Sequence, residues 1–336
     1  MKPGWRSTIG IALSAVLLWW TFRDVSLATV WAELRRSNGW MFLLSMISAT
    51  VIFPLRARRW RTILEPVAPR QPFGPLWRST AIGMMTNNLV PARAGEIARA
   101  YALTRETGIP LSTTIASLAV DRLFDTLVLL MLAAAAFFDP AFPREATIAG
   151  QTLGDLARGT IVLVVLLVAL LYFLAFFPTQ IVRIFEFFTR RISPALEERG
   201  KAVLTRFSEG LSVLKSPRRF ASVLAWTVLH WLVNALGFWF GFKAVGIDLP
   251  FSAALFLQTL IGVGVALPSA PGFFGVFEKV ATLGLAIYGI DATRATSFAI
   301  GFHILSFIPI TVIGLWYFVR LGLNMKQINK AREESA

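Results

Sequence analysis

A short polar run interrupts the apolar sequence between residues 88 and 99. It contains Asn88, Pro91, Arg93, Gly95, Glu96 and Arg99. Pro91 lacks a backbone donor and stops an incoming helix, while Gly95 lets two backbones approach closely. The amides of a helix that restarts after Pro91 attract an anion, and Arg93 would bind a phosphate through paired hydrogen bonds. The run therefore predicts a phosphate site beside a Glu96–Arg99 pair. The alternative is that Arg93 and Arg99 lie in the cytoplasmic headgroup layer.

A second group of charged residues, Asp121, Arg122 and Asp125, lies inside a long apolar run. Each ionised group near the bilayer centre costs at least ~2.5 kcal/mol on insertion scales. These side chains must therefore face protein or water, where they neutralise one another or hold Arg93. Two interpretations stay open: a structural ion pair, or a lipid or proton site in which Arg122 helps to bind phosphate.

A third run, at residues 268–278, follows the logic of the first. It contains Pro268, Pro271, Gly272, Gly275 and Glu278. The prolines break a helix, the glycines let it turn, and the glutamate lies one turn into the restarted helix. Burial favours the neutral form of a carboxylic acid, so Glu278 either couples transport to protons or pairs with Lys279 or Arg294. The alternative is a purely structural hairpin.

The composition indicates which elements hold these runs. Of the 336 residues, 56% are hydrophobic and 15% are charged, whereas soluble domains have about 25% charged residues. The net charge of +14 does not indicate nucleic-acid binding, because the basic residues lie between apolar runs, as the positive-inside rule predicts. Cysteine is absent, and His230 and His303 are far apart. We therefore expect no disulfide, metal site or cofactor.

The apolar runs predict about six membrane spans, since a hydrocarbon core needs roughly 20 residues per helix. The runs are Ser7–Phe22, Gly39–Leu55, Leu111–Phe138, Thr160–Phe177, Phe220–Phe242 and Thr296–Val319. Two other segments, Leu76–Glu106 and Phe251–Ile290, are broken by the polar runs. Such backbone is tolerated in a membrane only where protein or water satisfies it. We expect an all-α polytopic membrane protein with two re-entrant helical hairpins.

Basic residues orient these spans. The clusters at residues 56–61 and 183–219, together with the C-terminal tail, are predicted to face the cytoplasm. Residues 178–219 form a basic, partly amphipathic connector in this interpretation. The loops at residues 23–38 and 139–158 carry fewer and more balanced charges and are predicted to face outward. Both termini are then cytoplasmic, in a bacterial or archaeal inner membrane.

The order of the segments predicts an inverted repeat. Residues 1–138 read span, span, hairpin, span, and residues 158–320 repeat this order with the opposite topology. Secondary transporters often use this architecture, with the binding site at the interface between the repeats. We therefore expect a single membrane domain over residues 1–336.

The three polar runs together resemble the flippase-like family, also called the lysylphosphatidylglycerol synthase transmembrane region. The resemblance covers essentially the whole chain; Phe273 departs from it, since many members have a second glycine there. In aminoacyl-phosphatidylglycerol synthases such a region precedes a soluble transferase domain, and the resemblance implies that it moves the lipid product between leaflets. This sequence ends shortly after its sixth predicted span, so we expect a stand-alone member without aminoacyl transfer.

The leading expectation is a translocase, not an enzyme, for an anionic or polyprenyl-phosphate-linked lipid. Asn88, Arg93, Arg99 and Arg122 would bind the phosphate, while Glu96, Asp121, Asp125 and Glu278 would tune the charge or carry protons. Two alternatives stay open: an intramembrane lipid-modifying enzyme, and an accessory subunit of a lipid-synthesising enzyme. The expected partners are membrane lipids, and the sequence leaves open whether the chain is a monomer or a homo-oligomer.

Overall fold

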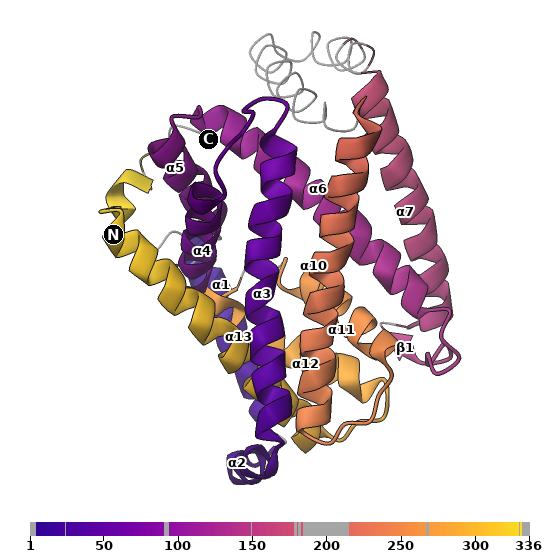
Figure 1. The fold of residues 1–336 in the computed structure, drawn as a ribbon. Coiled ribbons are helices and arrows are strands. Elements are labelled where there is room, and N and C mark those ends of the chain that lie inside the picture. Colours follow the sequence, from indigo (N-terminus) through magenta and orange to yellow (C-terminus); the bar gives the residue numbers. More distant parts are fainter. Residues whose placement is uncertain are drawn as a thin grey trace.

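The computed structural model describes residues 5–23, 25–90, 94–148, 150–177, 180, 183, 215–266, 269–328 and 330. These residues are mostly α-helical (Figure 1). The first half contains α1 (Trp5–Phe22), α2 (Leu27–Arg36), α3 (Gly39–Leu64), α4 (Phe73–Leu89), α5 (Gly95–Thr107) and α6 (Leu111–Ala136). Two short strands, β1 (Thr147–Ile148) and β2 (Gln151–Thr152), then pair antiparallel. The second half contains α7 (Leu153–Phe176), α10 (Pro217–Ala244), α11 (Phe251–Gly264), η2 (Pro271–Phe273), α12 (Val276–Ala286) and α13 (Ala292–Arg320).

Within the described residues, four helices are long and apolar enough to cross a membrane. These are α3, α7, α10 and α13; the pair α1 and α2, bent by 77°, makes a fifth if it is one span. The outer surface of α7 is apolar, with Val162, Val165 and Leu166 each more than half exposed, which suits contact with lipid. The chain is therefore an all-α, multi-pass integral membrane protein.

The structure corrects two predicted boundaries. The expected loop at residues 23–38 contains the helix α2, which packs against α13. The second predicted span ends at Leu55, but α3 continues to Leu64 and takes residues 56–61 into a helix. It continues because Phe53, Ala57, Trp60 and Leu64 repeat at helical spacing and are all buried. The basic cluster is therefore part of the helix, and some of its side chains face the protein interior.

Local sequence signals set where the long helices begin. The Asn38 side chain caps α3 by accepting from the amides of Trp40 and Met41. Ser216 and Asp291 cap α10 and α13 in the same way. Such caps satisfy amides that a first helical turn leaves unpaired. The predicted connector at residues 178–219 lies almost entirely outside the described residues, as do Pro91, Arg93 and Pro268.

The helices of the two halves pack against each other along the centre of the molecule. The two long helices α3 and α10 lie next to each other, α4 packs on α13, and α6 packs on α11 (Figure 1). The pairs α4–α5 and α11–α12 each form a packed unit on either side of a break in the chain.

A hydrogen bond joins the start of α11 to the loop after α6. The Ser252 hydroxyl donates to the Asp139 carboxylate at 2.6 Å, which lowers the pKa of that carboxyl.

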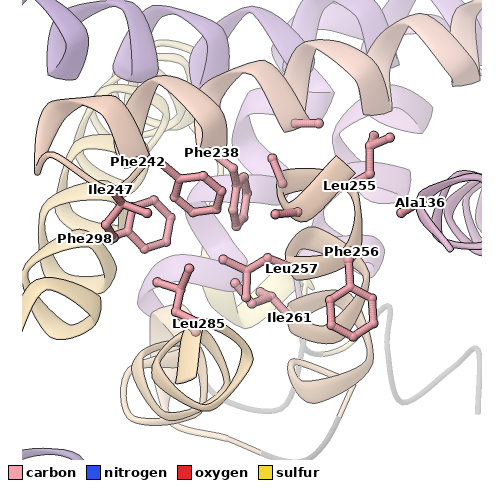
Figure 2. Packing of buried hydrophobic residues seen from close by; sticks show 14 of the residues in the cluster. Ala136, Phe238, Phe242, Ile247, Leu255, Phe256, Leu257, Ile261, Leu285 and Phe298 are labelled. Carbon is pink, nitrogen blue, oxygen red and sulfur yellow. The ribbon is translucent and has the colours of Figure 1, made fainter. Parts of the chain in front are cut away.

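The main apolar core lies in the second half, between α10, α11, α12 and α13 (Figure 2). The rings of Phe238 and Phe302 have centroids 4.3 Å apart, and those of Phe242 and Phe298 are 4.8 Å apart. Leu257 and Ile261 of α11 face this aromatic group. The core therefore fixes α11, the first arm of the second broken segment, relative to α10 and α13.

Candidate functional site

Two arginines of α3 face two aspartates of α6 in a buried cluster. The Arg59 Nε donates to Asp121 Oδ1 at 2.7 Å, and its Nη1 donates to Asp125 Oδ1 at 2.6 Å. The Arg56 Nη2 donates to Asp125 Oδ2 at 3.3 Å. All four residues are at most 8% exposed. Charges can be buried to this degree because each one faces an opposite charge and donates or accepts hydrogen bonds.

Arg99 joins this cluster from α5, the second arm of the first broken segment. Its Nη1 donates to Asp121 Oδ2 at 3.1 Å, and its guanidinium lies 4.0 Å from the ring centroid of Trp60. The Nε and Nη2 of Arg99 are buried and have no hydrogen-bond partner among the described residues. With Arg56 and Arg59, three guanidinium groups face two carboxylates. The cluster thus has one excess positive charge and unpaired buried donors, and an anion would satisfy both.

The predicted Glu96–Arg99 pair is wrong. Glu96 instead accepts from Arg122 at 2.5 Å, and both side chains are nearly half exposed. Arg99 points to Asp121 because that carboxylate is buried beside the inward face of α5. A helical spacing of three residues permits a pair but does not require one, and a fully buried partner competes strongly for the guanidinium.

The cluster extends to α10 through Trp231, whose Nε1 donates to Asp125 Oδ1 at 3.1 Å. His230 is also buried here, with its Nδ1 3.8 Å from Asp125 Oδ1. Trp231 has a second role, because it also lines the central cavity of the molecule. It therefore connects the charged cluster to that cavity.

The central cavity has a volume of about 220 Å³ and lies between the two broken segments. Met84 and Asn88 of α4 line one wall, and Gln258 and Ile261 of α11 line another. The remaining lining comes from α3, α10, α13, α12 and the turn before it, and it is mainly apolar. An apolar cavity with a few converging polar groups is the usual form of a ligand site.

Three amide side chains supply polar groups to this cavity. The Asn88 Nδ2 donates to Thr311 Oγ1 at 2.7 Å, and the Asn234 Nδ2 donates to Gln258 Oε1 at 3.0 Å. Gln258 is 2% exposed, yet its Nε2 has no partner among the described residues. A buried amide donor without an acceptor is costly, so the cavity offers a hydrogen bond to a carbonyl, hydroxyl or phosphate oxygen.

Glu278 and His303 form a second polar centre, in which His303 lines the cavity and Glu278 lies behind it. The Glu278 Oε2 accepts from the Gly275 amide at 2.6 Å, and its Oε1 lies 2.6 Å from His303 Nδ1. The His303 Nε2 lies 2.8 Å from the Gly272 carbonyl. Because a carbonyl only accepts, Nε2 must carry a hydrogen. One further proton then lies between Nδ1 and the carboxylate.

The expected partners of Glu278 are therefore wrong. Arg294 pairs with Asp291 at the start of α13, and Lys279 lies over the ring of Trp20, 4.0 Å from its centroid. Glu278 points inward because its carboxylate caps α12 through the Gly275 amide, as in a capping box. His303 lies on α13, one helical turn before Phe307. Its side chain contacts the inward-pointing carboxylate of Glu278.

The turn between α11 and α12 has an unusual backbone. Gly272, Phe273 and Gly275 have φ values of 69°, 63° and 86°. Only glycine adopts positive φ values without strain, so the backbone of Phe273 is strained. A Cβ atom on Gly275 would collide with the backbone of Ser14 in α1. The glycine therefore allows α1 and the turn to approach closely.

The structure brings some predicted site residues together and separates others. Arg99, Asp121 and Asp125 share the buried cluster, with Arg122 and Glu96 at its edge. Asn88 and Gly272 line the cavity. A side chain at Gly95 would collide with Asn87 and with the backbone of Gly83. Arg93, which the sequence predicts to bind phosphate, lies outside the described residues. Within the described ranges, no three His, Asp or Glu side chains converge as a metal site would require.

Sequence reasoning missed Arg56, Arg59, Gln258 and the role of His303. The two arginines carried a signal: Arg56 lies at helical spacing from the apolar, buried Phe53 and Trp60, and Arg59 from Ile52 and Ile63. The high density of basic residues at 56–61 instead indicates a cytoplasmic surface. Gln258 gave no such signal, since nothing in its sequence neighbourhood shows that it faces a cavity.

A family model described as the lysylphosphatidylglycerol synthase TM region matches residues 7–314. Several archaeal membrane proteins are similar along most of their length. A UPF0104 membrane protein of Methanocaldococcus jannaschii is 23% identical over 72% of this chain and 96% of its own. A UPF0104 membrane protein of Pyrococcus horikoshii is 24% identical over 91% of this chain and 93% of its own.

A third relative is named as an enzyme. Glycosyltransferase AglD of Haloferax volcanii is 28% identical over 70% of this chain, but the match covers 41% of AglD. The chain thus spans about two-fifths of that relative.

Proposed function

Because the chain belongs to the lysylphosphatidylglycerol synthase transmembrane-region family, we propose that it is a lipid translocase. It moves a lipid with an anionic phosphate headgroup between the leaflets and catalyses no chemical conversion. The observation that carries this proposal is the apolar central cavity between the two broken segments, which adjoins a buried cluster with excess positive charge.

The architecture that we propose is an inverted repeat of four elements. α1, α3, the α4–α5 hairpin and α6 correspond to α7, α10, the α11–α12 hairpin and α13. The packing supports this correspondence, because contacts in one half have counterparts in the other. The contacts α3–α4, α5–α6, α4–α13 and α3–α13 are matched by α10–α11, α12–α13, α11–α6 and α10–α6.

We propose six membrane spans, one of which is α6 although it contains charged residues. α6 has 26 residues, which is about 39 Å of helix and enough to cross a bilayer. Its two aspartates are buried against α3 and α5, and its half-exposed Arg122 pairs with Glu96 of α5. In this arrangement both termini lie in the cytoplasm of an archaeal or bacterial cell, and the protein lies in the cytoplasmic membrane.

The cavity and the cluster have separate roles in the proposed transport. The cavity, at about 220 Å³, is smaller than typical ligand pockets of about 300–1,000 Å³. The two hairpins must therefore move apart to admit a headgroup. Gln258 and Asn88 bind its oxygens inside, while Arg99 attracts the phosphate toward the cavity. Asp121 and Asp125 hold the arginines in position, and the Glu278–His303 pair exchanges a proton as the cavity opens.

The test fills the cavity and leaves the surface unchanged. Ser306 lines the cavity on α13, whereas Val312, on the same helix, is 60% exposed. We expect Ser306→Phe to slow lipid movement roughly tenfold, because overpacking costs about 1–3 kcal/mol. Val312→Phe should leave the rate unchanged. The measurement is dithionite quenching of a fluorescent anionic phospholipid in liposomes that contain the purified protein.

The same liposomes separate the alternatives. Equal rates for wild type and Ser306→Phe would show that lipid does not pass through this cavity. Conversion of the labelled lipid, detected by mass spectrometry, would indicate an intramembrane enzyme. Neither movement nor conversion would favour an accessory subunit of a lipid-synthesising enzyme. The partial match to a longer glycosyltransferase supports this last alternative, because a membrane region of this type occurs there within an enzyme.

A further inference from the structure

A second pocket lies at the end of the molecule where α3 ends and α10 begins. Its volume is about 550 Å³, and its lining is mainly polar. The walls come from three segments: the end of α3, the connection between α3 and α4, and the first turns of α10. The lining charges are Arg58, Arg61, Arg70, Arg218 and Arg219 with Glu65. The proposed function makes no use of this pocket.

The end of α3 directs its arginines to two different places. Arg56 and Arg59 face the aspartates of α6. Arg58 and Arg61 lie on another face of the helix, together with Glu65, and line the pocket. Residues at spacings of three, four and seven share one face of a helix. The pocket arginines are therefore a separate group from the buried cluster.

The pocket has far more positive than negative charge. Its five guanidinium groups face one carboxylate, that of Glu65, which lies 3.4 Å from the Nε of Arg219. In the described part of the chain, Arg61, Arg70 and Arg218 have no carboxylate within ion-pair distance. The buried cluster differs, because each of its arginines has an aspartate partner. Like charges that converge without partners repel one another, and a bound anion removes this repulsion.

The start of α10 increases this positive potential. Its first turn contains no acidic residue, but it contains Arg218 and Arg219 next to the cap Ser216. A helix N-terminus has a partial positive charge and favours acidic side chains nearby. α5, α7 and α12 follow that rule with Glu96, Asp155 and Glu278. In α10 the helix dipole and two arginines act in the same direction.

We propose that this pocket binds a diphosphate group. Guanidinium groups bind phosphate oxygens through two parallel hydrogen bonds, and here they approach from α3 on one side and α10 on the other. Two opposed pairs of arginines suit two linked phosphates better than one. Thr62, Ser216 and Ser222 add hydroxyl donors. The inference is independent of lipid movement, because the diphosphate can belong to a lipid headgroup or to a soluble molecule.

The first experiment uses the purified full chain in nanodiscs of neutral lipid, titrated by calorimetry with inorganic pyrophosphate and with inorganic phosphate at equal ionic strength. We expect saturable binding of one pyrophosphate, about tenfold or more tighter than phosphate. The double variant Arg61→Gln/Arg218→Gln should weaken pyrophosphate binding about tenfold or more. The control Arg35→Gln/Arg36→Gln removes the same charge from α2, outside the pocket, and should bind within about twofold of wild type.

Two results would overturn the proposal: no saturable pyrophosphate binding by wild type, or equal losses in the pocket and control variants. Thermal melting checks that the variants are folded. Should the double variant fail this check, Arg70→Gln, which changes one exposed side chain on the connection, replaces it with the same expected direction.

The second experiment identifies the source of the diphosphate. Nanodiscs that contain an isoprenoid diphosphate are titrated with pyrophosphate and compared with nanodiscs that contain phosphatidylglycerol. Competition by the isoprenoid diphosphate alone assigns the site to a lipid-linked diphosphate. Binding of pyrophosphate without competition by either lipid assigns it to a soluble one. Equal competition by phosphatidylglycerol would reduce the pocket to a general headgroup contact and contradict a diphosphate site.

Discussion

Single residues in this protein are defined by partners from distant parts of the chain. Arg59 reaches Asp121 and Asp125 across 62 and 66 residues of sequence. His303 reaches Glu278 and Gly272 in the same way. Each of these polar groups is buried, and breaking a buried ion pair typically costs about 3–5 kcal/mol. Their positions are therefore fixed by one another and not by solvent.

The shared proton of Glu278 and His303 leads to a prediction at this scale. In Glu278→Gln the amide oxygen would accept from the Gly275 amide and the amide nitrogen would donate to His303 Nδ1. Both hydrogen bonds persist, but no proton is shared. We expect near-normal thermal stability and loss of the proton movement that accompanies lipid movement, measured with a pH-sensitive dye inside proteoliposomes.

A matched control neutralises another carboxylate of a broken segment. Glu106 accepts from Arg78 at 2.9 Å, whereas Glu278 faces a histidine. Glu106→Gln should leave proton movement intact. Proton movement at the wild-type rate in Glu278→Gln would rule out the pair as the coupling site, whereas lipid movement itself would still be tested by the cavity-filling variant.

At the scale of elements, the broken segments depend on close backbone approach. Gly95 lies against the backbone of Gly83, so α5 packs tightly on α4 directly after the break between them. Gly275 lies against the backbone of Ser14, so the second turn packs on α1. In both places a side chain would push the elements apart. The glycines of the polar runs thus set the distances between helices.

This dependence predicts different costs for two glycine substitutions at positions with positive φ. Gly275 and Gly289 have φ values of 86° and 73°, but a Cβ on Gly289 meets open space. Gly289→Ala should cost roughly 1–2 kcal/mol for the left-handed conformation alone. Gly275→Ala should cost at least twice that, because its ψ of −50° lies outside the left-handed helical region and α1 must also move. Thermal unfolding of both variants in detergent measures the difference, and equal melting temperatures would contradict the close packing.

At the scale of the whole molecule, the two halves pack against each other through a nearly symmetric set of helix–helix contacts. α3 and α10 meet at the centre, and each half's hairpin packs on the last helix of the other half. The cavity lies where these contacts converge. A site at the interface between two oppositely oriented halves can be opened to either side by rocking one half against the other.

The proposed inverted repeat, in which the two hairpins have opposite orientations, predicts opposite accessibility of their entrances. The chain contains no cysteine, so single cysteines can be introduced at Gly74 and at Asp248. A side chain at Gly74 meets only the flexible end of Arg78, and the Asp248 side chain is 94% exposed. An impermeant thiol reagent should label the two positions from opposite sides of the membrane. Labelling of both from the same side would disprove the inverted repeat.

Much of the helical layout follows from local sequence. Apolar runs predict α3, α6, α7, α10 and α13, and proline with glycine predicts both breaks. Local patterns fail where tertiary burial overrides them. The basic residues 56–61 indicate a cytoplasmic surface beyond the end of a span at Leu55, yet they continue α3 because Trp60 and Leu64 are buried on one of its faces. Residues 23–38 read as a loop, and α2 forms there against α13.

The sequence by itself determined that this chain is a helical membrane protein, since about 20 apolar residues in a row can only satisfy their backbone as a spanning helix. It also identified the polar runs where chemistry is concentrated. Only the tertiary structure decided the pairing: Arg99 with Asp121 instead of Glu96, and Glu278 with His303 instead of Lys279 or Arg294. The reason is that a buried charge pairs with an opposite charge or a hydrogen-bonding group that lies close to it in the folded structure. The spacing of two residues in the sequence does not give their distance in space.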